Sequence, residues 1–158
     1  MVSEDIVLEI VPNTDKERSR HQDALEWHVS ATYLFENTAD EEVSVKVGFP
    51  ELACDGDSPC PEEHPYSFHD LETTVRGKQI THEVDFLAKQ STKLATFYKL
   101  DKVHLFDVTF APKEKLTITH TYRHTLSGSV EGNTAHYVTR TGALWASPID
   151  RATFTVKV

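Results

Sequence analysis

The chain is poor in sulfur and has no long apolar run. Its 158 residues include only two cysteines and one methionine. Two cysteines cannot supply the framework of a disulfide-rich fold, and a chain of this length can bury a core without one. No apolar stretch approaches the roughly 18 residues that a membrane-spanning helix requires. We therefore expect a globular protein that is not inserted into a membrane.

Basic side chains are also scarce. Sixteen lysines and arginines stand against 25 aspartates and glutamates, which gives a net charge of −9. Such a chain lacks the positive patch with which proteins bind nucleic acids or anionic membranes. Residues 1–5 show neither the basic nor the apolar stretch of a signal peptide. Either the protein stays in the cytosol or its leader has been removed.

Apolar residues alternate with polar ones along most of the chain. In residues 25–35 every second side chain is apolar, from Leu25 through Trp27 to Phe35. Side chains of a strand point alternately to opposite faces, so this pattern predicts a half-buried β-strand. Residues 43–49 repeat the pattern and end at Pro50, which predicts a hairpin with the first strand.

The same rule predicts strands over residues 6–10, 73–76, 80–87, 104–110, 116–126 and 152–158. We expect Phe106, Val108 and Phe110 to face inward, and likewise Ala152, Phe154, Val156 and Val158. Residues 13–23 and 88–101 are the only candidates for short helices. The prediction is one all-β domain over residues 1–158, an antiparallel β-sandwich of about eight to ten strands. The strand pattern at the last residues indicates a fragment of a longer precursor.

The loop of residues 54–64 gathers the most ligand-type side chains. Its spacing allows a disulfide between Cys54 and Cys60 in an oxidising compartment. It also allows a metal site, since carboxylates suit Ca²⁺ while thiols and imidazole suit Zn²⁺. The third interpretation is that residues 54–64 form a solvated acidic loop with free thiols. The candidate metal ligands are Asp55, Asp57, Glu62, Glu63 and His64, with the two cysteines as further zinc ligands.

Nine histidines are many for this length. His120, Tyr122 and His124 alternate with polar residues and share a face with Leu116 and Ile118. Two strand residues four apart are separated by about 13 Å, so the two histidines cannot hold one ion without help from other strands. We expect them to be hydrogen-bonded residues near the edge of the sandwich.

Catalytic patterns are missing from the sequence. It contains no Gly-x-Ser-x-Gly element, no phosphate-binding glycine loop and no His-Glu-x-x-His element. Trp27 and Trp145 are expected in the core, because large aromatic residues dominate sandwich interiors. Trp145 follows a loop-like segment, so it could instead stack on a ligand together with Tyr137 or Tyr122.

Three stretches resemble a bacterial domain-of-unknown-function family. Residues 3–8 read Ser-Glu-Asp-Ile-Val-Leu, residues 33–37 read Tyr-Leu-Phe-Glu-Asn ahead of Phe49-Pro50, and residues 141–149 read Thr-Gly-Ala-Leu-Trp-Ala-Ser-Pro-Ile. The resemblance implies a mature exported domain, periplasmic or extracellular, whose signal peptide is absent here. It favours the disulfide and supplies no catalytic residue. The polar stretch 13–23 and the cysteine loop depart from the family pattern.

Three functions remain open from the sequence. The leading hypothesis is a non-catalytic binding or envelope-structural module with a protein or glycan partner and no cofactor. The second is a Ca²⁺- or Zn²⁺-dependent module or hydrolase that uses the 54–64 loop with His120 or His124. The third is a carbohydrate-binding sandwich that uses the three aromatic residues named above.

Overall fold

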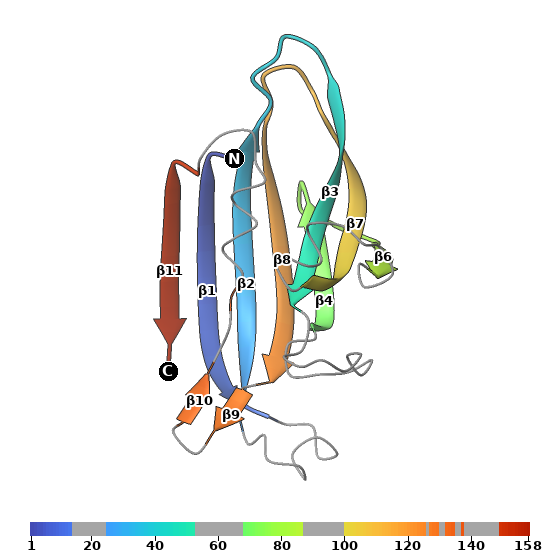
Figure 1. Ribbon diagram of the computed structural model, residues 1–158. Helices are drawn as coiled ribbons and strands as arrows, with labels where there is room; N and C mark the ends of the chain where they lie inside the picture. The colour runs from blue at the N-terminus through green and yellow to red at the C-terminus, as the bar shows by residue number, and fades with distance from the viewer. Residues whose placement is uncertain are drawn as a thin grey trace.

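The protein is all-β in the part that the computed structural model describes, namely residues 1–13, 25–52, 68–86, 100–125, 127–129, 132–134, 137 and 149–158. Eleven strands and no helix occur in these ranges (Figure 1). They are β1 Ser3–Pro12, β2 Leu25–Glu36, β3 Val43–Leu52, β4 His69–Val75, β5 Lys78–Ile80, β6 Glu83–Phe86, β7 Leu100–Phe110, β8 Lys115–Thr125, β9 Ser127–Ser129, β10 Gly132–Thr134 and β11 Arg151–Lys157. The described residues contain no helix long and apolar enough to cross a membrane.

Two sheets form a mostly antiparallel sandwich, as the alternation predicts. The larger sheet has the order β11-β1-β2-β8-β4-β5, and the smaller one has the order β3-β7-β6. Strands β9 and β10 form a separate two-stranded ribbon. Residues of both sheets meet in a core cluster, with Phe35 and Ile118 from the larger sheet and Val47 and Phe106 from the smaller. The smaller sheet therefore covers the inner side of β2, β8 and β4, and leaves β11 outside the sandwich.

The hairpin predicted between residues 25–35 and 43–49 is wrong. Strand β2 lies in the larger sheet, whereas β3 lies in the smaller sheet and pairs with β7. The chain therefore crosses between the sheets at residues 37–42, because the two alternating segments bury their apolar faces against each other rather than side by side.

The strands predicted over residues 73–76 and 80–87 are only half confirmed. Arg76 and Gly77 join β4 to β5 with φ angles of 53° and 73°. Positive φ at both positions belongs to the two-residue turn whose twist matches a hairpin. However, residues 80–87 do not form one strand, because the chain crosses between the sheets after β5. Strand β6 then pairs with β7 in the smaller sheet, and His82 lies at the crossing.

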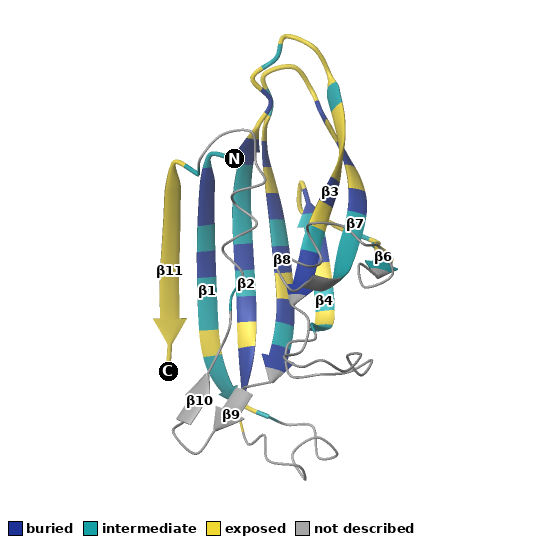
Figure 2. Ribbon diagram, in the orientation of Figure 1, coloured by how far each residue is buried: buried dark blue, intermediate teal, exposed yellow. Residues whose placement is uncertain are grey.

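Strand β11 corrects two predictions. It pairs with β1 in parallel, with Ile6 opposite Phe154, whereas we expected antiparallel pairing throughout. The expected inward set Ala152, Phe154, Val156 and Val158 is exposed, and Figure 2 shows the whole strand in the exposed colour. Alternation shows which side chains share a face, but it does not show whether a second layer covers that face.

Inward packing is confirmed elsewhere. Phe106, Val108 and Phe110 are buried, as are Trp27 and Val29. Segment 13–23, interpreted as a solvated loop or at most one short helix, and segment 88–101, a candidate for a short helix, lie almost entirely outside the described residues. The exceptions are Asn13 after β1 and residues 100–101, which begin β7 and so are strand.

Candidate functional site

A buried carboxylate organises the inner polar cluster of the sandwich. Glu51, near the end of β3, is 1% exposed and lies opposite Lys102 of β7, where the strand pairing shifts by one residue. Its Oε1 accepts a hydrogen bond from His104 Nε2 at 2.9 Å, and Lys102 Nζ forms an ion pair with Oε2 at 3.1 Å. Burial alone would raise the pKa of Glu51, but His104 and Lys102 outweigh it and lower that pKa.

A threonine links two histidines deeper in the core. Thr73 Oγ1 lies 2.6 Å from His82 Nε2 and 2.6 Å from His120 Nδ1, so the hydroxyl can donate to one ring and accept from the other. His120 is 2% exposed and stacks on Phe49 with 4.0 Å between ring centroids. Burial, assisted by the charges of His82 and His104, lowers the pKa of His120 to about 3. The imidazole is therefore neutral at physiological pH.

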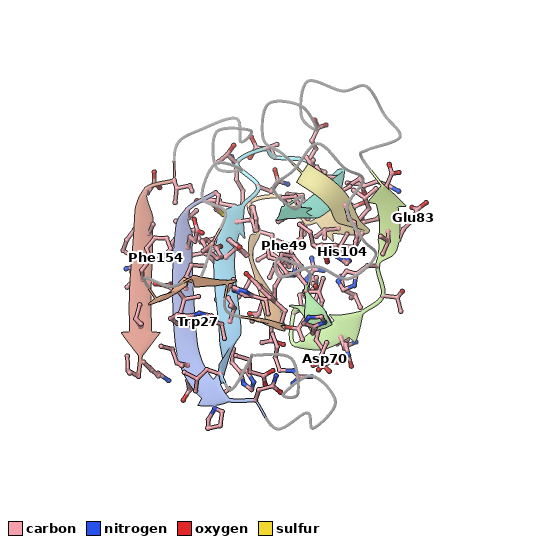
Figure 3. All side chains as sticks on the ribbon, turned by 60° about the horizontal axis from the view of Figure 1, so that its bottom comes forward. Trp27, Phe49, Asp70, Glu83, His104 and Phe154 are labelled. Atoms are coloured by element: carbon pink, nitrogen blue, oxygen red, sulfur yellow. The ribbon has the colours of Figure 1, made fainter. Side chains whose placement is uncertain are left out.

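These groups form one continuous inner polar cluster: Glu51, Lys102, His104, His82, Thr73 and His120. The rings of His82 and His104 lie 5.6 Å apart and join its two halves. Figure 3 shows Phe49 and His104 close together in the region where the sheets face each other. The cluster thus runs from β3 of the smaller sheet to β8 of the larger one, and the rings of Phe49 and Phe106 pack against His120.

A small cavity of about 40 Å³ adjoins this cluster beside His120, Tyr33 and Glu4. Tyr137 donates a hydrogen bond to Glu4 at 2.8 Å and lies 2.6 Å from the hydroxyl of Tyr33. Burial raises the pKa of both tyrosines, so their hydroxyls stay protonated. Such a volume holds a few waters at most and is far below the size of a metabolite site.

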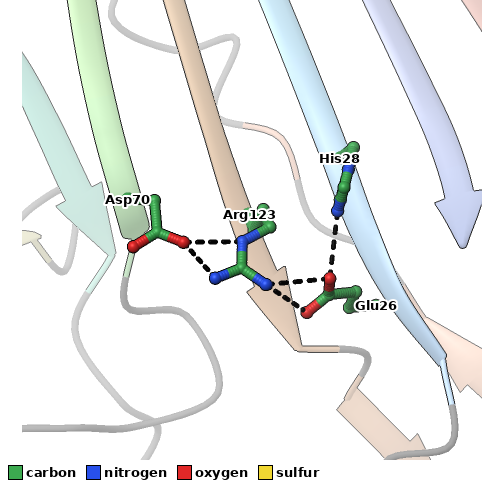
Figure 4. A network of polar contacts seen from close by, with 4 residues as sticks. All are labelled: Glu26, His28, Asp70 and Arg123. Atoms are coloured by element: carbon green, nitrogen blue, oxygen red, sulfur yellow. Dashed lines mark hydrogen bonds and ion pairs between the residues drawn. The ribbon is translucent and has the colours of Figure 1, made fainter. Parts of the chain in front are cut away.

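The outer face of the larger sheet carries a second network, centred on Arg123 of β8 (Figure 4). Its guanidinium donates to Glu26 of β2 at 3.0 and 3.3 Å and to Asp70 of β4 at 2.8 Å through Nε, with a further contact from Nη2. His28 Nε2 donates to Glu26 at 3.0 Å. The hydrogen bonds that Arg123 donates to Asp70 and to Glu26, in that order of size, raise the pKa of its guanidinium.

The position of Asp70 follows from an irregularity in β4. The pairing of β4 with β8 shifts between His69 and Glu72, and Asp70 has a φ of 53°. A bulge re-aims the side chains beside it, and aspartate tolerates the left-handed conformation better than most residues. The irregularity thereby places the Asp70 carboxylate against Arg123.

Beside this network lies an open groove of about 320 Å³, which we call the outer groove. It lies over β1, β2, β8 and β4. Side chains from all four strands line it, among them Glu9, His28, Ser30, Glu72, Thr121 and Arg123. Three carboxylates, those of Glu9, Asp70 and Glu72, line the groove with one arginine, and that arginine is already paired with Asp70 and with Glu26 beside the groove. The groove can therefore offer hydroxyl hydrogen bonds and net negative charge to a solute.

Two of the residues predicted as ligand-stacking aromatics are described. Tyr122 is buried on the inner face, where its ring packs 4.1 Å from Phe68 and 5.7 Å from Phe49. Tyr137 packs edge-on against Phe154. The structure thus places the Tyr122 ring in the core and ties the Tyr137 hydroxyl to Glu4 and Tyr33. The third residue, Trp145, lies outside the described residues.

The predicted cysteine and metal loop also lies outside the described residues. This covers Cys54, Cys60, Asp55, Asp57, Glu62, Glu63 and His64, so the disulfide and the metal site remain predictions. In the ranges that are described, no group of three or more His, Cys, Asp or Glu side chains is arranged to hold a metal ion.

The two predicted histidines of β8 share their inner face, as expected, and His120 is hydrogen-bonded. They do not lie at a sheet edge, because β8 runs between β2 and β4.

The sequence analysis missed Glu51, His82 and His104 in the core, and it missed Arg123 with Glu26 on the outer face. Of these residues, only Arg123 stands out in the sequence. It is the one basic residue among the outward-facing positions 117, 119, 121 and 123, which otherwise carry threonine.

Comparisons with known proteins agree with the fold and confirm the predicted resemblance. The family model described as domain of unknown function DUF4424 matches residues 26–93. The chain is also similar to a solved structure from Legionella pneumophila, named a "putative nutrient binding protein", with 26% identity and a TM-score of 0.70. That match covers 93% of this chain and 46% of the Legionella chain, so the present chain spans about half of that protein. No curated protein matches the sequence.

Proposed function

We propose that this protein is a non-catalytic β-sandwich module that binds a small polar solute in the outer groove. The observation that carries the proposal is the groove itself, about 320 Å³ in volume and lined by hydroxyl and charged side chains of four strands. Ligand sites of small-molecule binders begin at roughly 300 Å³. The name of the Legionella protein supports the same class of function.

The lining favours a cationic solute. Glu9 and Glu72 contribute carboxylates, while the charge of Arg123 is already balanced by Asp70 and Glu26. The hydroxyls of Ser30 and Thr121 lie opposite each other on adjacent strands and can orient an amine or a hydroxyl group. We therefore assign the ligand to the class of small amines, and we expect small dicarboxylates to be repelled.

Calorimetric titration with defined probes tests this proposal. Putrescine and lysinamide should bind saturably, and succinate should not. Thr121→Trp should abolish binding because the indole fills the groove. Thr117→Trp is the matched control, because Thr117 lies on the same face of β8 outside the groove, and it should leave binding unchanged. Absence of amine binding, or an equal loss in both variants, would overturn the proposal.

We further propose that the protein acts outside the cytosol, in the periplasm or beyond the cell. The family resemblance and the Cys54–Cys60 spacing support this location. Protein isolated from its native host should have an intact mass about 2 Da below that of the reduced chain, because bridging removes two thiol hydrogens. Equal masses would contradict the bridge and weaken the case for export, because cytosolic thiols normally stay reduced.

A further inference from the structure

Two carboxylates of the outer groove come from its two outermost strands. Glu9 belongs to β1 and Glu72 to β4, and strands β2 and β8 lie between them (Figure 1). Glu9 lies opposite His28 of β2, which faces Arg123 of β8, whereas Glu72 lies opposite Thr121. Three interstrand spacings of about 4.8 Å and a two-residue offset of about 7 Å put the two α-carbons about 16 Å apart. The two carboxylates therefore cannot share one ammonium group.

The charges in and around the groove leave it attractive to cations. Four carboxylates and two basic side chains give a net charge of −2 while His28 is neutral; they are Glu9, Glu26, Asp70, Glu72, Arg123 and Lys157. Lys157 of β11 lies opposite Glu9, on the side away from the groove, and weakens the attraction of Glu9 for a cation. The Arg151–Asp5 ion pair lies further along β1 and β11 and adds no net charge.

The middle of the groove differs from its two ends. Ser30 and Thr121 lie opposite each other there and offer hydroxyl groups. Arg123 lies in the neighbouring cross-strand row, where its guanidinium is held between Glu26 and Asp70 (Figure 4). This fixed cation repels a positive charge from the middle of the groove. The favourable positions for positive charge are thus the two ends, beside Glu9 and Glu72.

We propose that the groove selects linear dications whose charged ends lie about 10 Å apart. This inference rests on the proposed function and narrows its ligand class by length. If each ammonium group lies about 3 Å inside its carboxylate, the span of about 16 Å leaves about 10 Å between the nitrogens. An extended alkyl chain advances about 1.3 Å per bond, so the eight methylenes of 1,8-diaminooctane span about 11 Å and the four of putrescine about 6 Å. Putrescine can therefore contact only one of the two carboxylates at a time.

Calorimetric titration of the two diamines at pH 8, above the usual range of histidine titration, tests the inference. We expect 1,8-diaminooctane to bind about fivefold more tightly than putrescine, because it gains a second exposed ion pair. In Glu9→Gln and in Glu72→Gln this ratio should fall to about twofold or less. Both residues are exposed, and retained putrescine binding shows that each variant is folded. Glu83→Gln, which changes an exposed carboxylate of the smaller sheet, is the control and should keep the ratio.

The outcomes separate this inference from the function on which it rests. Equal affinity of both diamines for the unmodified protein would overturn the length selection and leave amine binding in the groove standing. Binding of neither diamine would overturn both. A ratio that survives in either Glu→Gln variant would also overturn the inference, because the longer chain would then gain through apolar contact or through one carboxylate alone. Lys157→Gln should tighten the binding of 1,8-diaminooctane about twofold, and weaker binding would contradict the position assigned to its ammonium group.

Discussion

The two faces of the β4–β8 pair both carry polar networks, and the networks have opposite surroundings. On the inner face, His120 lies beside Thr73 in a region closed by Phe49 and Phe106. On the outer face, three residues away along β8 from His120, Arg123 pairs with Glu26 and Asp70 at the side of an open groove. The same strands thus hold one network away from water and present the other to it.

The comparison teaches that burial, rather than residue type, decides what a polar group contributes. An unpaired polar group in the interior costs its full desolvation, so the inner cluster must stay intact for the sandwich to close. Outer groups can exchange a protein partner for water at little cost and remain available to a ligand. The predictions below test this contrast.

Removal of the Glu51 carboxylate should give the largest loss of stability. Glu51→Ala leaves Lys102 and His104 nearly buried without their counter-charge, so the free energy of unfolding should fall by about 3 kcal/mol. Urea denaturation measures the change. The control is Glu83→Ala, which breaks the exposed pair with Lys46 and should cost less than about 0.5 kcal/mol. Similar losses in both variants would contradict the contrast.

Removal of the Thr73 hydroxyl, which links His82 and His120, should give the second-largest loss of stability. Thr73→Val keeps the side-chain shape and removes the hydrogen bonds to His82 and His120, so stability should fall by about 2 kcal/mol. Thr74→Val, on the outer face of the same strand, should change it by less than about 0.5 kcal/mol. If Thr74→Val were the more harmful change, the inner cluster would not have the structural role assigned to it.

Lowering the pH should destabilise the folded protein through the histidines of the inner polar cluster. The pKa of His120 in the folded protein is about 3, while an unfolded histidine titrates near 6.5. Because the unfolded chain binds the proton first, stability is fully present above pH 6.5 and falls as the pH drops below it, by up to about 1.4 kcal/mol per pH unit for this residue. The pKa of His82 is also lowered, so it acts in the same direction.

Urea titrations between pH 7 and pH 5 measure how steeply the free energy of unfolding changes with pH. This range covers the onset of protonation of histidine in the unfolded chain and stays above the pKa of about 3 of His120 in the folded protein. In His120→Gln the slope should be shallower, because glutamine does not titrate, while His82 still contributes. An unchanged slope in that variant, or constant stability of the unmodified protein over this range, would contradict a neutral buried His120.

The outer network should give the smallest stability effect. Arg123→Gln removes the guanidinium from a half-exposed position, and Asp70 is itself largely exposed, so we expect a loss of about 1 kcal/mol or less. Asp70→Asn should cost less still, because it spares buried Glu26. Thermal melts in low and high salt measure both variants. A loss above that of Thr73→Val would place Arg123 among the structural residues.

Much of the fold could be predicted, because alternation is a local property. Residues 25–35, 43–49, 104–110 and 116–126 all form strands close to the predicted bounds. The failures are non-local. Nothing near residues 37–42 or residue 81 shows that the chain changes sheets there, and nothing in residues 152–158 shows that they lack a second layer in the part of the chain that the structure describes.

The candidate site was less predictable for the same reason. Glu51 and His104 meet because β3 pairs with β7, and His82 joins them through a sheet crossing, so residues far apart in sequence form one cluster. His120 could be assigned to its face from its own strand. Its partner Thr73 belongs to β4, and only the β4–β8 register brings the two together.

The position of bound solute tests the central claim most directly. Amide chemical shifts of the ¹⁵N-labelled protein should be followed during titration with putrescine. The account predicts saturable changes confined to outer-groove residues such as Ser30, Glu72 and Thr121, with Trp27 and His120 on the inner face unaffected. Changes centred on the inner cluster, or spread over the whole surface without saturation, would contradict it.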